Sequence, residues 1–302
     1  MRAREEVPKP VPEEGAEPRR QEVLGPGRVE ASRPGPDERL TPVSAASPPG
    51  ALEVRNVSKA FGGVQAVQDM SLAVRPGEIV SLIGPNGAGK TTLLNLISGF
   101  YRPDSGEIHF GGKRIDGLTP DKVTAAGIAR TFQSLRVFSE LTVLDNVMVA
   151  GHHRLGVGWL PAVLGFRRYR MRSRELEATS LSALSFFGRR LMGYRLSQPV
   201  RVLSYANRRR VEMARAMATG AALLLLDEPS AGMNPRETEE ISRLILRMRD
   251  ELGFAILLVE HKMNLVEQVS DRVIAMDFGS KLAEGSYRDV VTDPSVVESY
   301  LG

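Results

Sequence analysis

Hydrophobic positions follow two strand patterns along the chain. Leu52 and Val54 alternate with Glu53 and Arg55, which is typical of a half-exposed strand, and we expect this strand at the edge of a sheet. Other segments are continuous apolar runs, short enough for strands that are buried on both faces. These runs span residues 79–83, 223–226, 255–259 and 273–276.

Helical patterns lie between the apolar runs. Residues 91–98 and 237–252 are predicted helices. Strands that alternate with helices favour an α/β fold, in which helices cover the faces of a mostly parallel sheet. The segment from about 135 to 202 differs because it is rich in arginine and poor in strand patterns, so we assign it to a separate helical subdomain.

The first 50 residues form a second predicted region. They contain ten of the 19 prolines, with mixed charges and no aromatic residue. Such a segment cannot bury enough apolar surface to offset its chain entropy, so we expect a disordered, proline-rich tail over residues 1–50. A proline-rich recognition peptide is the alternative interpretation. The folded domain is then predicted to span residues 51–302.

Composition narrows the class of protein. The chain of 302 residues is 42% hydrophobic and 25% charged, as in ordinary soluble domains. Its longest apolar run falls well short of the roughly 18 residues of a membrane-spanning helix. The chain has no cysteine, which excludes disulfides and thiolate metal sites and suits a reducing compartment. The formal charge of +4 permits contact with nucleic acid or an anionic membrane but does not require it.

A glycine-rich loop follows the apolar run 79–83. It fits the pattern of glycine, four residues and Gly-Lys-Thr, and a predicted helix follows it. Glycines let backbone N–H groups point at phosphate oxygens, Lys90 can bridge the β- and γ-phosphates of ATP, and the Thr91 hydroxyl can ligate Mg2+. The predicted nucleotide-binding residues are Gly84, Pro85, Asn86, Gly87, Ala88, Gly89, Lys90, Thr91 and Thr92.

Two further strand ends carry candidate chemistry. The run 223–226 ends in Asp227 and Glu228, and parallel strands deliver their carboxyl ends to the same edge of the sheet as the phosphate loop. Asp227 is therefore predicted to hold magnesium, and Glu228 to activate the attacking water as general base. His261 follows the run 255–259 and is predicted to sense the γ-phosphate, the alternative being an ordinary structural histidine.

These motifs, in this order, resemble the ATP-binding cassette (ABC) family of phosphate-loop NTPases over about residues 52–302. The stretch Leu203-Ser204-Tyr205-Ala206-Asn207 is similar to the signature sequence that separates this family from other such NTPases. In that family two cassettes pair head to tail, and the signature of one closes on the ATP of the other. The resemblance therefore implies a second ABC ATPase subunit, whose ATP is contacted by Ser204, Ala206 and Asn207. It also implies an antiparallel β region at the edge of the core.

Other site residues follow from the same resemblance. Gln133 matches the glutamine that contacts magnesium and couples hydrolysis to the membrane partner. Phe61 matches the aromatic residue that stacks on adenine, and residues 231–234 match the loop that crosses the dimer interface. His261 matches the switch histidine. The catalytic set implied is thus Glu228, His261 and Gln133, with Thr91, Gln133 and Asp227 at the metal.

Longer stretches are similar to the larger ATPase of branched-chain amino-acid importers. They are residues 127–133, 141–147, 228–235 and 299–302, with a long basic insert after residues 151–153. This resemblance implies a peripheral subunit on the cytoplasmic face of the inner membrane. Its implied partners are a second, different cassette, two polytopic permease subunits and, indirectly, a periplasmic or lipid-anchored solute-binding protein, with no nucleic acid.

Other functions remain alternatives from the sequence. Importers of urea or short amides share much of the pattern, and exporters of the lipopolysaccharide type have a closely similar cassette. A weakly catalytic, ATP-sensing subunit is a third alternative, because the signature departs from the family pattern. An ABC protein acting on nucleic acid or the ribosome is disfavoured, since such proteins usually carry two cassettes or a coiled-coil insert, and this chain has one cassette.

The departures concern the signature and one later position. Ala206 stands where the second glycine of Leu-Ser-Gly-Gly-Gln is usual, and Asn207 replaces the glutamine. We expect Ser204 to cap a helix, with the Ala206 methyl group standing where a γ-phosphate approaches. Asn207 is one methylene short of reaching back to the Ser204 main chain, so we expect a weaker cap. Lys262 occupies a position that is usually acidic in the subfamily.

Overall fold

Residues 52–152 and 167–301 are described by this computed structural model of the 302-residue chain. The expected disordered tail, residues 1–50, lies outside the described residues, as do residues 153–166. All helices and strands described below belong to one unit of the fold, Leu40–Gly302.

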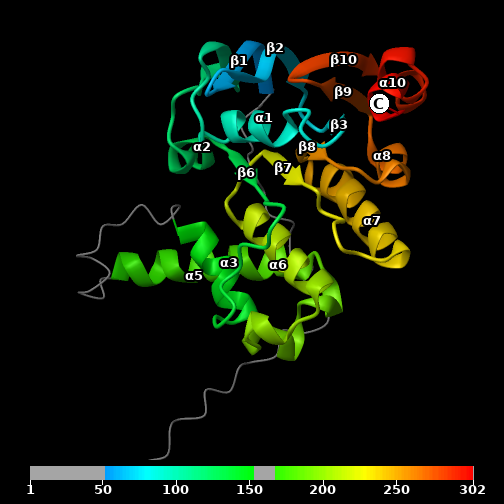
Figure 1. Cartoon of the computed structure of the whole chain (residues 1–302). Helices are drawn as coiled ribbons and strands as arrows, with labels where there is room; N and C mark the ends of the chain where they lie inside the picture. The colour runs from blue at the N-terminus through cyan, green and yellow to red at the C-terminus, as the bar shows by residue number, and fades with distance from the viewer. Residues whose placement is uncertain (1–51, 153–166, 302) are drawn as a thin grey trace, which may run out of the picture. The chain divides into compact units, whose positions relative to one another are not determined.

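A six-stranded sheet forms the centre of this unit (Figure 1). Its strands are β3 (Ile79–Ile83), β6 (Ile128–Arg130), β7 (Leu223–Asp227), β8 (Ala255–Val259), β9 (Arg272–Asp277) and β10 (Ser280–Gly285). They lie in the order β10, β9, β3, β8, β7, β6, with parallel neighbours from β9 to β6 and an antiparallel β10. The predicted mostly parallel α/β sheet is confirmed.

The sheet is packed on both faces, as the apolar runs predict. Leu223 and Leu225 of β7 belong to one core cluster, whereas Leu224 and Leu226 belong to the other. Successive side chains of a strand point to opposite faces of a sheet, so this division means that neither face of β7 meets solvent. A strand buried in this way needs apolar residues at every position, and the unbroken leucine run supplies them.

A second, antiparallel sheet lies above the first. Its strands are β1 (Leu52–Phe61), β2 (Val64–Val74), β4 (Ser105–Phe110) and β5 (Lys113–Arg114), in the order β2, β1, β4, β5. Leu52 and Val54 are buried and Arg55 is exposed, as the alternation predicts, but the expected edge position is wrong. β1 pairs with β2 on one side and with β4 on the other. Alternation reports which face of a strand is buried and carries no information about its lateral neighbours.

Helices cover both faces of the central sheet. The helices of the described residues are α1 (Lys90–Ile97), α2 (Pro120–Ala126), α3 (Val143–Gly151), α5 (Arg167–Ser185), α6 (Tyr205–Ala218), α7 (Pro235–Leu252), α8 (Met263–Val269), α9 (Tyr287–Val291) and α10 (Pro294–Leu301), with short 3-10 turns at Gly188–Arg190, Gly193–Ser197 and Val200–Val202. Helix α1 packs between the two sheets, because its leucines share a core cluster with residues of both. Helices α6 and α7 pack in the cluster on the other face.

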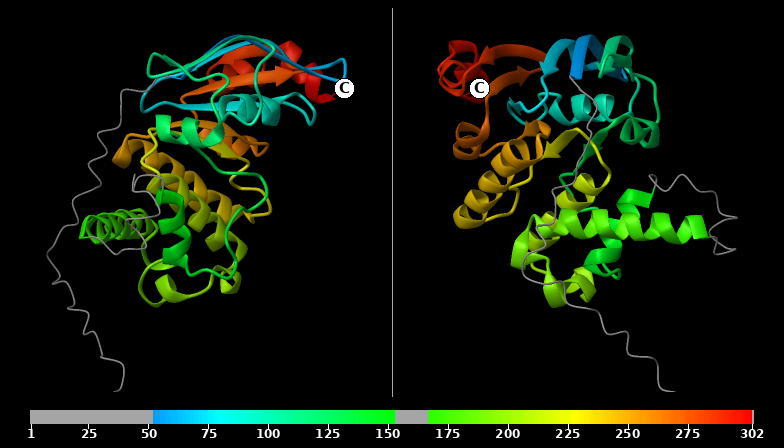
Figure 2. Two further views of the ribbon diagram at one scale, coloured as in Figure 1. Left: turned by 90° about the vertical axis from the view of Figure 1, so that its left-hand side faces the viewer. Right: turned by 180° about the vertical axis from the view of Figure 1, so that it is seen from behind.

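The strand-poor interval expected to form a helical subdomain, residues 135–202, contains α3, α5 and the short turns in its described part. Both views of Figure 2 place these helices beside α6, at the end of the unit opposite the antiparallel sheet. Helix α6 starts after that interval and packs against both α3 and α5. The boundary of 135–202 stays a prediction, and α6 is the element that joins this helical region to the sheet.

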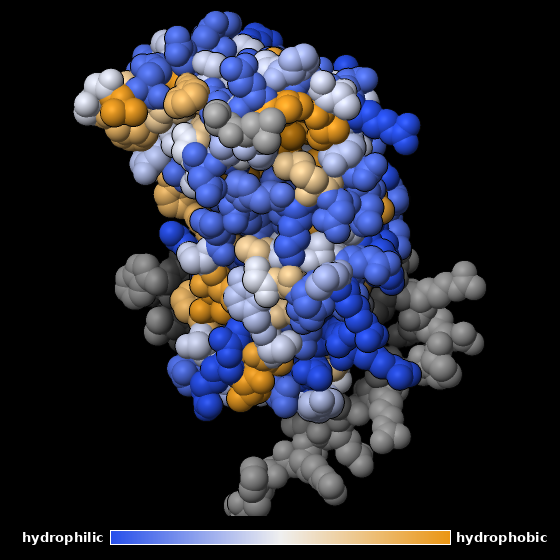
Figure 3. Space-filling view, turned by 45° about the vertical axis from the view of Figure 1, so that its right-hand side comes forward, coloured by the Kyte–Doolittle hydropathy of each residue, from blue (hydrophilic) through white to orange (hydrophobic). Residues whose placement is uncertain are grey.

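The described helices and the surface bear on the expectation that no segment spans a membrane. Across residues 52–152 and 167–301, no helix is long and apolar enough to cross a bilayer. The face shown in Figure 3 is largely hydrophilic, and its hydrophobic positions form separate patches.

Candidate active site

Three neighbouring strands of the central sheet end at the same edge. Val259, the last residue of β8, is in register with Asp227 of β7 and with Leu82 of β3. The residues that follow these strands therefore come together, as expected for parallel strands. They are the phosphate loop after β3, Glu228 after β7 and the residues from 260 onward after β8.

The phosphate loop connects β3 directly to α1. Gly84 and Gly89 have φ angles of +149° and +98°, a region that favours glycine. A Cβ atom at Gly84 would lie 2.0 Å from the Met276 carbonyl oxygen, and one at Gly89 would lie 2.3 Å from that of Ala66. The loop can therefore follow this path only with glycine at both positions. All nine predicted phosphate-loop residues, from 84 to 92, lie between the end of β3 and the first turn of α1.

Lys90 lies inside the turn of this loop. Its Nζ atom donates to the carbonyl oxygens of Gly84 at 2.7 Å and Pro85 at 2.8 Å. Burial lowers the pKa of the Lys90 ammonium below its usual value, while the carboxylates of Glu228 and Asp227 act in the opposite direction. The side chain is thus a buried cation at the edge of the sheet, in the place where the phosphates of a nucleotide need a positive charge.

Glu228 brings the three predicted catalytic residues together. Its Oε2 atom accepts a hydrogen bond from Nε2 of Gln133 at 3.0 Å. Its Oε1 atom lies 3.0 Å from Nε2 of His261. These residues come from three separate segments that follow β6, β7 and β8. A carboxylate held at both oxygens has a defined direction, which is what a general base needs.

The main chain of Glu228 is held as tightly as its side chain. Its φ angle is +46°, in the left-handed region that residues with a side chain rarely adopt. The N–H group donates to the Val259 carbonyl at 2.9 Å, and the carbonyl accepts from Ala231 N–H and from Arg209. Such strained positions, which cost about 1–3 kcal/mol, persist where surrounding contacts over-determine them, and they are concentrated at functional sites.

Asp227 and its neighbours fit a magnesium ion. Oδ2 of Asp227 accepts from Arg130 at 2.9 Å, whereas its buried Oδ1 has no hydrogen-bond partner within the part of the chain that is described. Thr91, Gln133 and Asp227 line the same open cavity of about 530 Å³. Oxygen ligands of this kind suit Mg2+, which is bound by one or two protein groups together with water and phosphates. The three residues expected at the metal therefore share one cavity.

Phe61 lies at the end of β1 with 42% of its surface exposed. Its ring makes a T-shaped contact with the ring of Tyr101, with the ring centroids 5.1 Å apart. Tyr101 itself lines the cavity that holds Thr91 and Asp227. Phe61 is thus a half-exposed ring beside the phosphate site, in a position where a base can stack on it.

The signature residues lie at the start of α6. Ser204 caps the helix, and its side chain accepts from Asn207 N–H at 3.4 Å. The expectation for the Ala206 methyl group is wrong, because Ala206 is only 4% exposed and packs in a core cluster. At the second position of the helix the Cβ atom points back toward the protein, whereas Ser204 and Tyr205 are exposed. The Asn207 side chain is buried and accepts from Arg210 at 2.9 Å.

Three residues of the site were missed by sequence reasoning. Arg130 bonds to Asp227, Arg209 bonds to the carbonyl of Glu228, and Glu260 accepts from the N–H of His261 at 2.9 Å. Glu260 directly follows an apolar strand, as Asp227 ends one, so the same strand-end signal could have identified it. The two arginines lie in patterns that surface helices and strands also show, and only the tertiary structure reveals that they are buried.

The chain is similar to known proteins along most of its length. The sequence profile of the ABC transporter family matches residues 67–231. The chain is 39% identical over 256 residues to the high-affinity branched-chain amino acid transport ATP-binding protein BraF of Pseudomonas aeruginosa, covering 83% of this chain and 97% of BraF. It is 40% identical over 254 residues to the ATP-binding protein LivG of Salmonella typhimurium, again covering 83% and 97%.

Solved structures agree with this similarity. The ADP conformation of an ATP-binding cassette of an ABC transporter superposes with a TM-score of 0.72 at 31% identity, covering 84% of this chain and 99% of that one. A dimeric bacterial ABC transporter cassette superposes with a TM-score of 0.62 at 25% identity, covering 78% and 99%. With its phosphate loop, its acidic strand end and this similarity over most of its length, the chain belongs to the ABC transporter family, as one of the ATP-hydrolysing cassettes.

Proposed function

We propose that this cassette drives an importer of branched-chain amino acids and works as a peripheral subunit on the cytoplasmic face of the inner membrane. The similarity to BraF and LivG over 83% of the chain supports this solute. The observation that carries the catalytic part of the proposal is the Glu228 carboxylate, which Gln133 and His261 contact at 3.0 Å from two sides.

In this proposal the residues have separate tasks. Glu228 accepts the proton of the attacking water, a role that typically contributes a rate factor of about 10²–10⁴. Gln133 and His261 orient its carboxylate, and Lys90 with the N–H groups of the loop binds the phosphate oxygens. Magnesium, held by the Thr91 hydroxyl, Asp227 and Gln133, would supply charge neutralisation at the phosphates. The adenine base stacks on Phe61.

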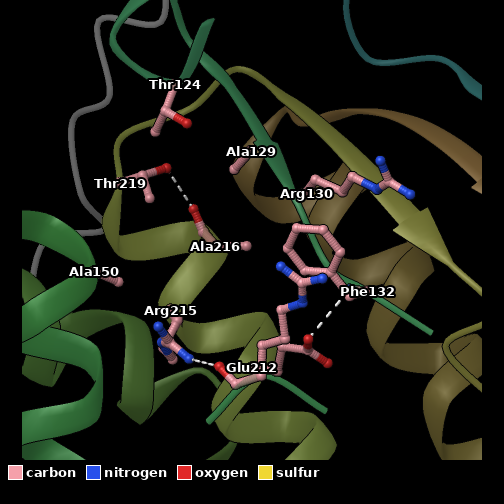
Figure 4. Close-up of a pocket in the computed structure, with 10 residues that line it drawn as sticks. Thr124, Ala129, Arg130, Phe132, Ala150, Glu212, Arg215, Ala216 and Thr219 are labelled. Atoms are coloured by element: carbon pink, nitrogen blue, oxygen red, sulfur yellow. Dashed lines mark hydrogen bonds between the residues drawn. The ribbon is translucent and has the colours of Figure 1, made fainter. Parts of the chain in front are cut away.

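We infer that a permease subunit docks beside residues 130–133, the segment that ends in Gln133 and that we call the glutamine loop. A cavity of about 230 Å³ lies between β6 and helices α3 and α6, next to the ring of Phe132 (Figure 4). Phe132 N–H donates to Glu212 of α6 at 3.2 Å, so the cavity wall is tied to the helical region. Because Gln133 follows Phe132, a permease segment in this cavity would act directly on a residue that contacts Glu228. The dimeric form of the related bacterial cassette supports a second cassette as the other partner.

Transport by the reconstituted complex tests this proposal. The chain is assembled in proteoliposomes with its partner cassette, two permease subunits and the solute-binding protein, and uptake of labelled leucine, isoleucine and valine is measured with internal ATP. We expect uptake that depends on ATP and is lost with Lys90→Ala, because that substitution removes the buried cation of the phosphate loop.

Other outcomes would identify the alternatives. Uptake of urea or a short amide without uptake of leucine would contradict the proposed solute and favour the related amide importers. Movement of a lipid outward would contradict import itself. Leucine uptake that persists in the Lys90→Ala variant would mean that the partner cassette alone powers transport, with this chain as an ATP-sensing subunit.

A further inference from the structure

Lys262 binds the loop that follows the catalytic carboxylate. Its Nζ atom donates to the carbonyl oxygen of Ser230 at 3.1 Å and to that of Met233 at 2.8 Å. It also donates to Oγ1 of Thr238, on the first turn of α7, at 2.8 Å. An ammonium group has three N–H donors, so this set of acceptors uses all of them.

Glu260 holds the same loop from the other side of His261. This carboxylate is only 2% exposed. Its Oε1 atom accepts from Ser230 N–H at 2.9 Å, and its Oε2 atom accepts from the N–H groups of His261 at 2.9 Å and Lys262 at 3.2 Å. Both main-chain polar groups of Ser230 are therefore bonded to residues that flank His261.

These contacts join two loops that each carry one catalytic residue. Glu228 lies two positions before Ser230 on the loop after β7, and His261 lies between Glu260 and Lys262 on the loop after β8. We call Glu260, Lys262 and their hydrogen-bond partners on residues 230, 233 and 238 the loop clamp. Because the clamp fixes one loop against the other, it also fixes the 3.0 Å approach of His261 Nε2 to Glu228 Oε1.

The surroundings of position 262 require a side chain that donates hydrogen bonds. Two of its three acceptors are main-chain carbonyl oxygens, and the third is a hydroxyl whose own proton is available to the Asn234 carbonyl at 3.0 Å. A carboxylate in this place would face two oxygens that cannot donate to it. A methionine would fill a similar volume and leave the Met233 carbonyl without this donor, which costs free energy, whereas the Ser230 carbonyl would keep its bond from Met233 N–H at 3.1 Å.

We infer that Lys262 is a positioning residue for ATP hydrolysis, acting through Ser230 and Met233 on the geometry of Glu228 and His261. This inference rests on the proposed role of Glu228 as general base. The lysine touches neither the phosphates nor the water in this assignment. Its loss should therefore lower the rate of the chemical step more than the affinity for ATP, because displacement of a catalytic group by about 1 Å can cost two orders of magnitude in rate.

Steady-state ATPase kinetics of the assembled transporter test the clamp. We expect Lys262→Met to lower kcat about tenfold while KM for ATP stays within about twofold of the wild type. Lys262→Arg, which restores donors and charge, should recover much of kcat, whereas Lys262→Asp should be at least as slow as Lys262→Met. Lys281→Met is the matched control, because Lys281 also donates to a carbonyl, that of Ser71 at 3.0 Å, but lies on β10.

Two further measurements separate positioning from loss of fold. Thermal melting and the stoichiometry of bound ATP are measured for each variant, and kcat is expressed per ATP site. A Lys262→Met variant with wild-type kcat per site would overturn the inference, as would a fall in kcat that Lys262→Arg does not reverse. Glu228→Gln is measured in parallel. If Glu228→Gln hydrolyses ATP normally, the proposed catalytic assignment fails, whereas normal kcat in Lys262→Met beside an inactive Glu228→Gln refutes the clamp alone.

Discussion

Nη2 of Arg209 donates to the main-chain carbonyl oxygen of Glu228 at 3.1 Å. Arg209 lies in α6, the helix that begins with the signature, and its side chain is completely buried. The same guanidinium donates to the carbonyls of Phe132 and Gln133, and it pairs with Glu212 at 2.6 Å. One side chain thus connects the signature helix, the glutamine loop and the catalytic turn within a single cassette.

Arg209→Lys should reduce both stability and hydrolysis. Lysine keeps the positive charge beside Glu212, but its single ammonium cannot reproduce the planar fork that serves three carbonyls. We expect a stability loss of about 1–3 kcal/mol, because buried acceptors lose their donor, and a fall in kcat of several-fold. Urea unfolding and ATPase assays measure these effects. Arg190→Lys is the control, since Arg190 is exposed and pairs with Glu240 at 3.1 Å. A fully stable and fully active Arg209→Lys protein would contradict the coupling.

Glu228→Gln should separate ATP binding from hydrolysis. The amide has the same shape and can still contact Gln133 and His261, so ATP affinity should be nearly unchanged. Hydrolysis should fall by about 10² or more, because the amide cannot accept the proton of the attacking water. Binding of a fluorescent ATP analogue and phosphate release measure the two properties. Comparable turnover in the variant would remove Glu228 from the role of general base.

Phe61→Ala should weaken nucleotide binding through the base. Stacking of a base on an aromatic ring contributes about 1–3 kcal/mol, so the dissociation constant for ATP should rise by a factor between about five and about 150. Inorganic triphosphate has no base, so it should bind the Phe61→Ala variant and the wild type with equal affinity. The matched control is Phe278→Ala, because Phe278 is 84% exposed on the turn between β9 and β10. Equal ATP affinity in Phe61→Ala and the wild type would place the adenine elsewhere.

The central sheet and its strand ends could be predicted because they depend on local patterns. An unbroken apolar run such as 223–226 can only be buried on both faces, and the parallel arrangement then brings Asp227 and Glu228 to the edge that carries the phosphate loop. The glycine pattern of residues 84–91 is equally local. Its φ angles and close backbone contacts allow few other residues, so the motif is visible without any tertiary information.

The predictions that were wrong, and the residues that were missed, depend on contacts between distant segments. The lateral place of β1 is set by pairing with β4, about fifty residues later, which alternation in β1 does not encode. The burial of Ala206 follows from the packing of α6 against the core, and the motif alone says nothing of which face is buried. Arg209 and Lys262 donate hydrogen bonds to main-chain carbonyls on other loops. Because every residue type has such a carbonyl, the sequence does not reveal which one a side chain will contact.

The altered signature should make the two ATP sites of the assembled transporter unequal. In the proposed head-to-tail pair, Ser204 and Asn207 would serve the ATP of the partner cassette, whereas Lys90 and Glu228 would serve the ATP of this chain. The site that uses this chain's phosphate loop should be the faster one, provided that the partner's signature is intact. In the Ala206→Gly/Asn207→Gln double variant, turnover should rise only at the partner's site.

The structure predicts different effects for the two substitutions, Ala206→Gly and Asn207→Gln. Ala206→Gly alone should bring no gain and should cost about 0.5–1 kcal/mol of stability, because the methyl is buried and glycine is unfavourable in a helix. Asn207→Gln should carry the gain, about 1 kcal/mol or several-fold, because the longer amide can reach back to Ser204 N–H and complete a capping box. Arg210, released from Asn207, keeps its bond to Glu240 at 2.5 Å.

The measurement is ATP hydrolysis by the assembled transporter with the catalytic glutamate of the partner cassette either intact or mutated. If Asn207→Gln speeds hydrolysis when the partner's glutamate is intact and has no effect when it is mutated, the signature serves the partner's site. Acceleration in both backgrounds would mean that the signature acts on this chain's own ATP, so the assignment of sites would be wrong. No change in either background would mean that Asn207 is tolerated without consequence, because a weaker cap that limited turnover must respond when the cap is restored.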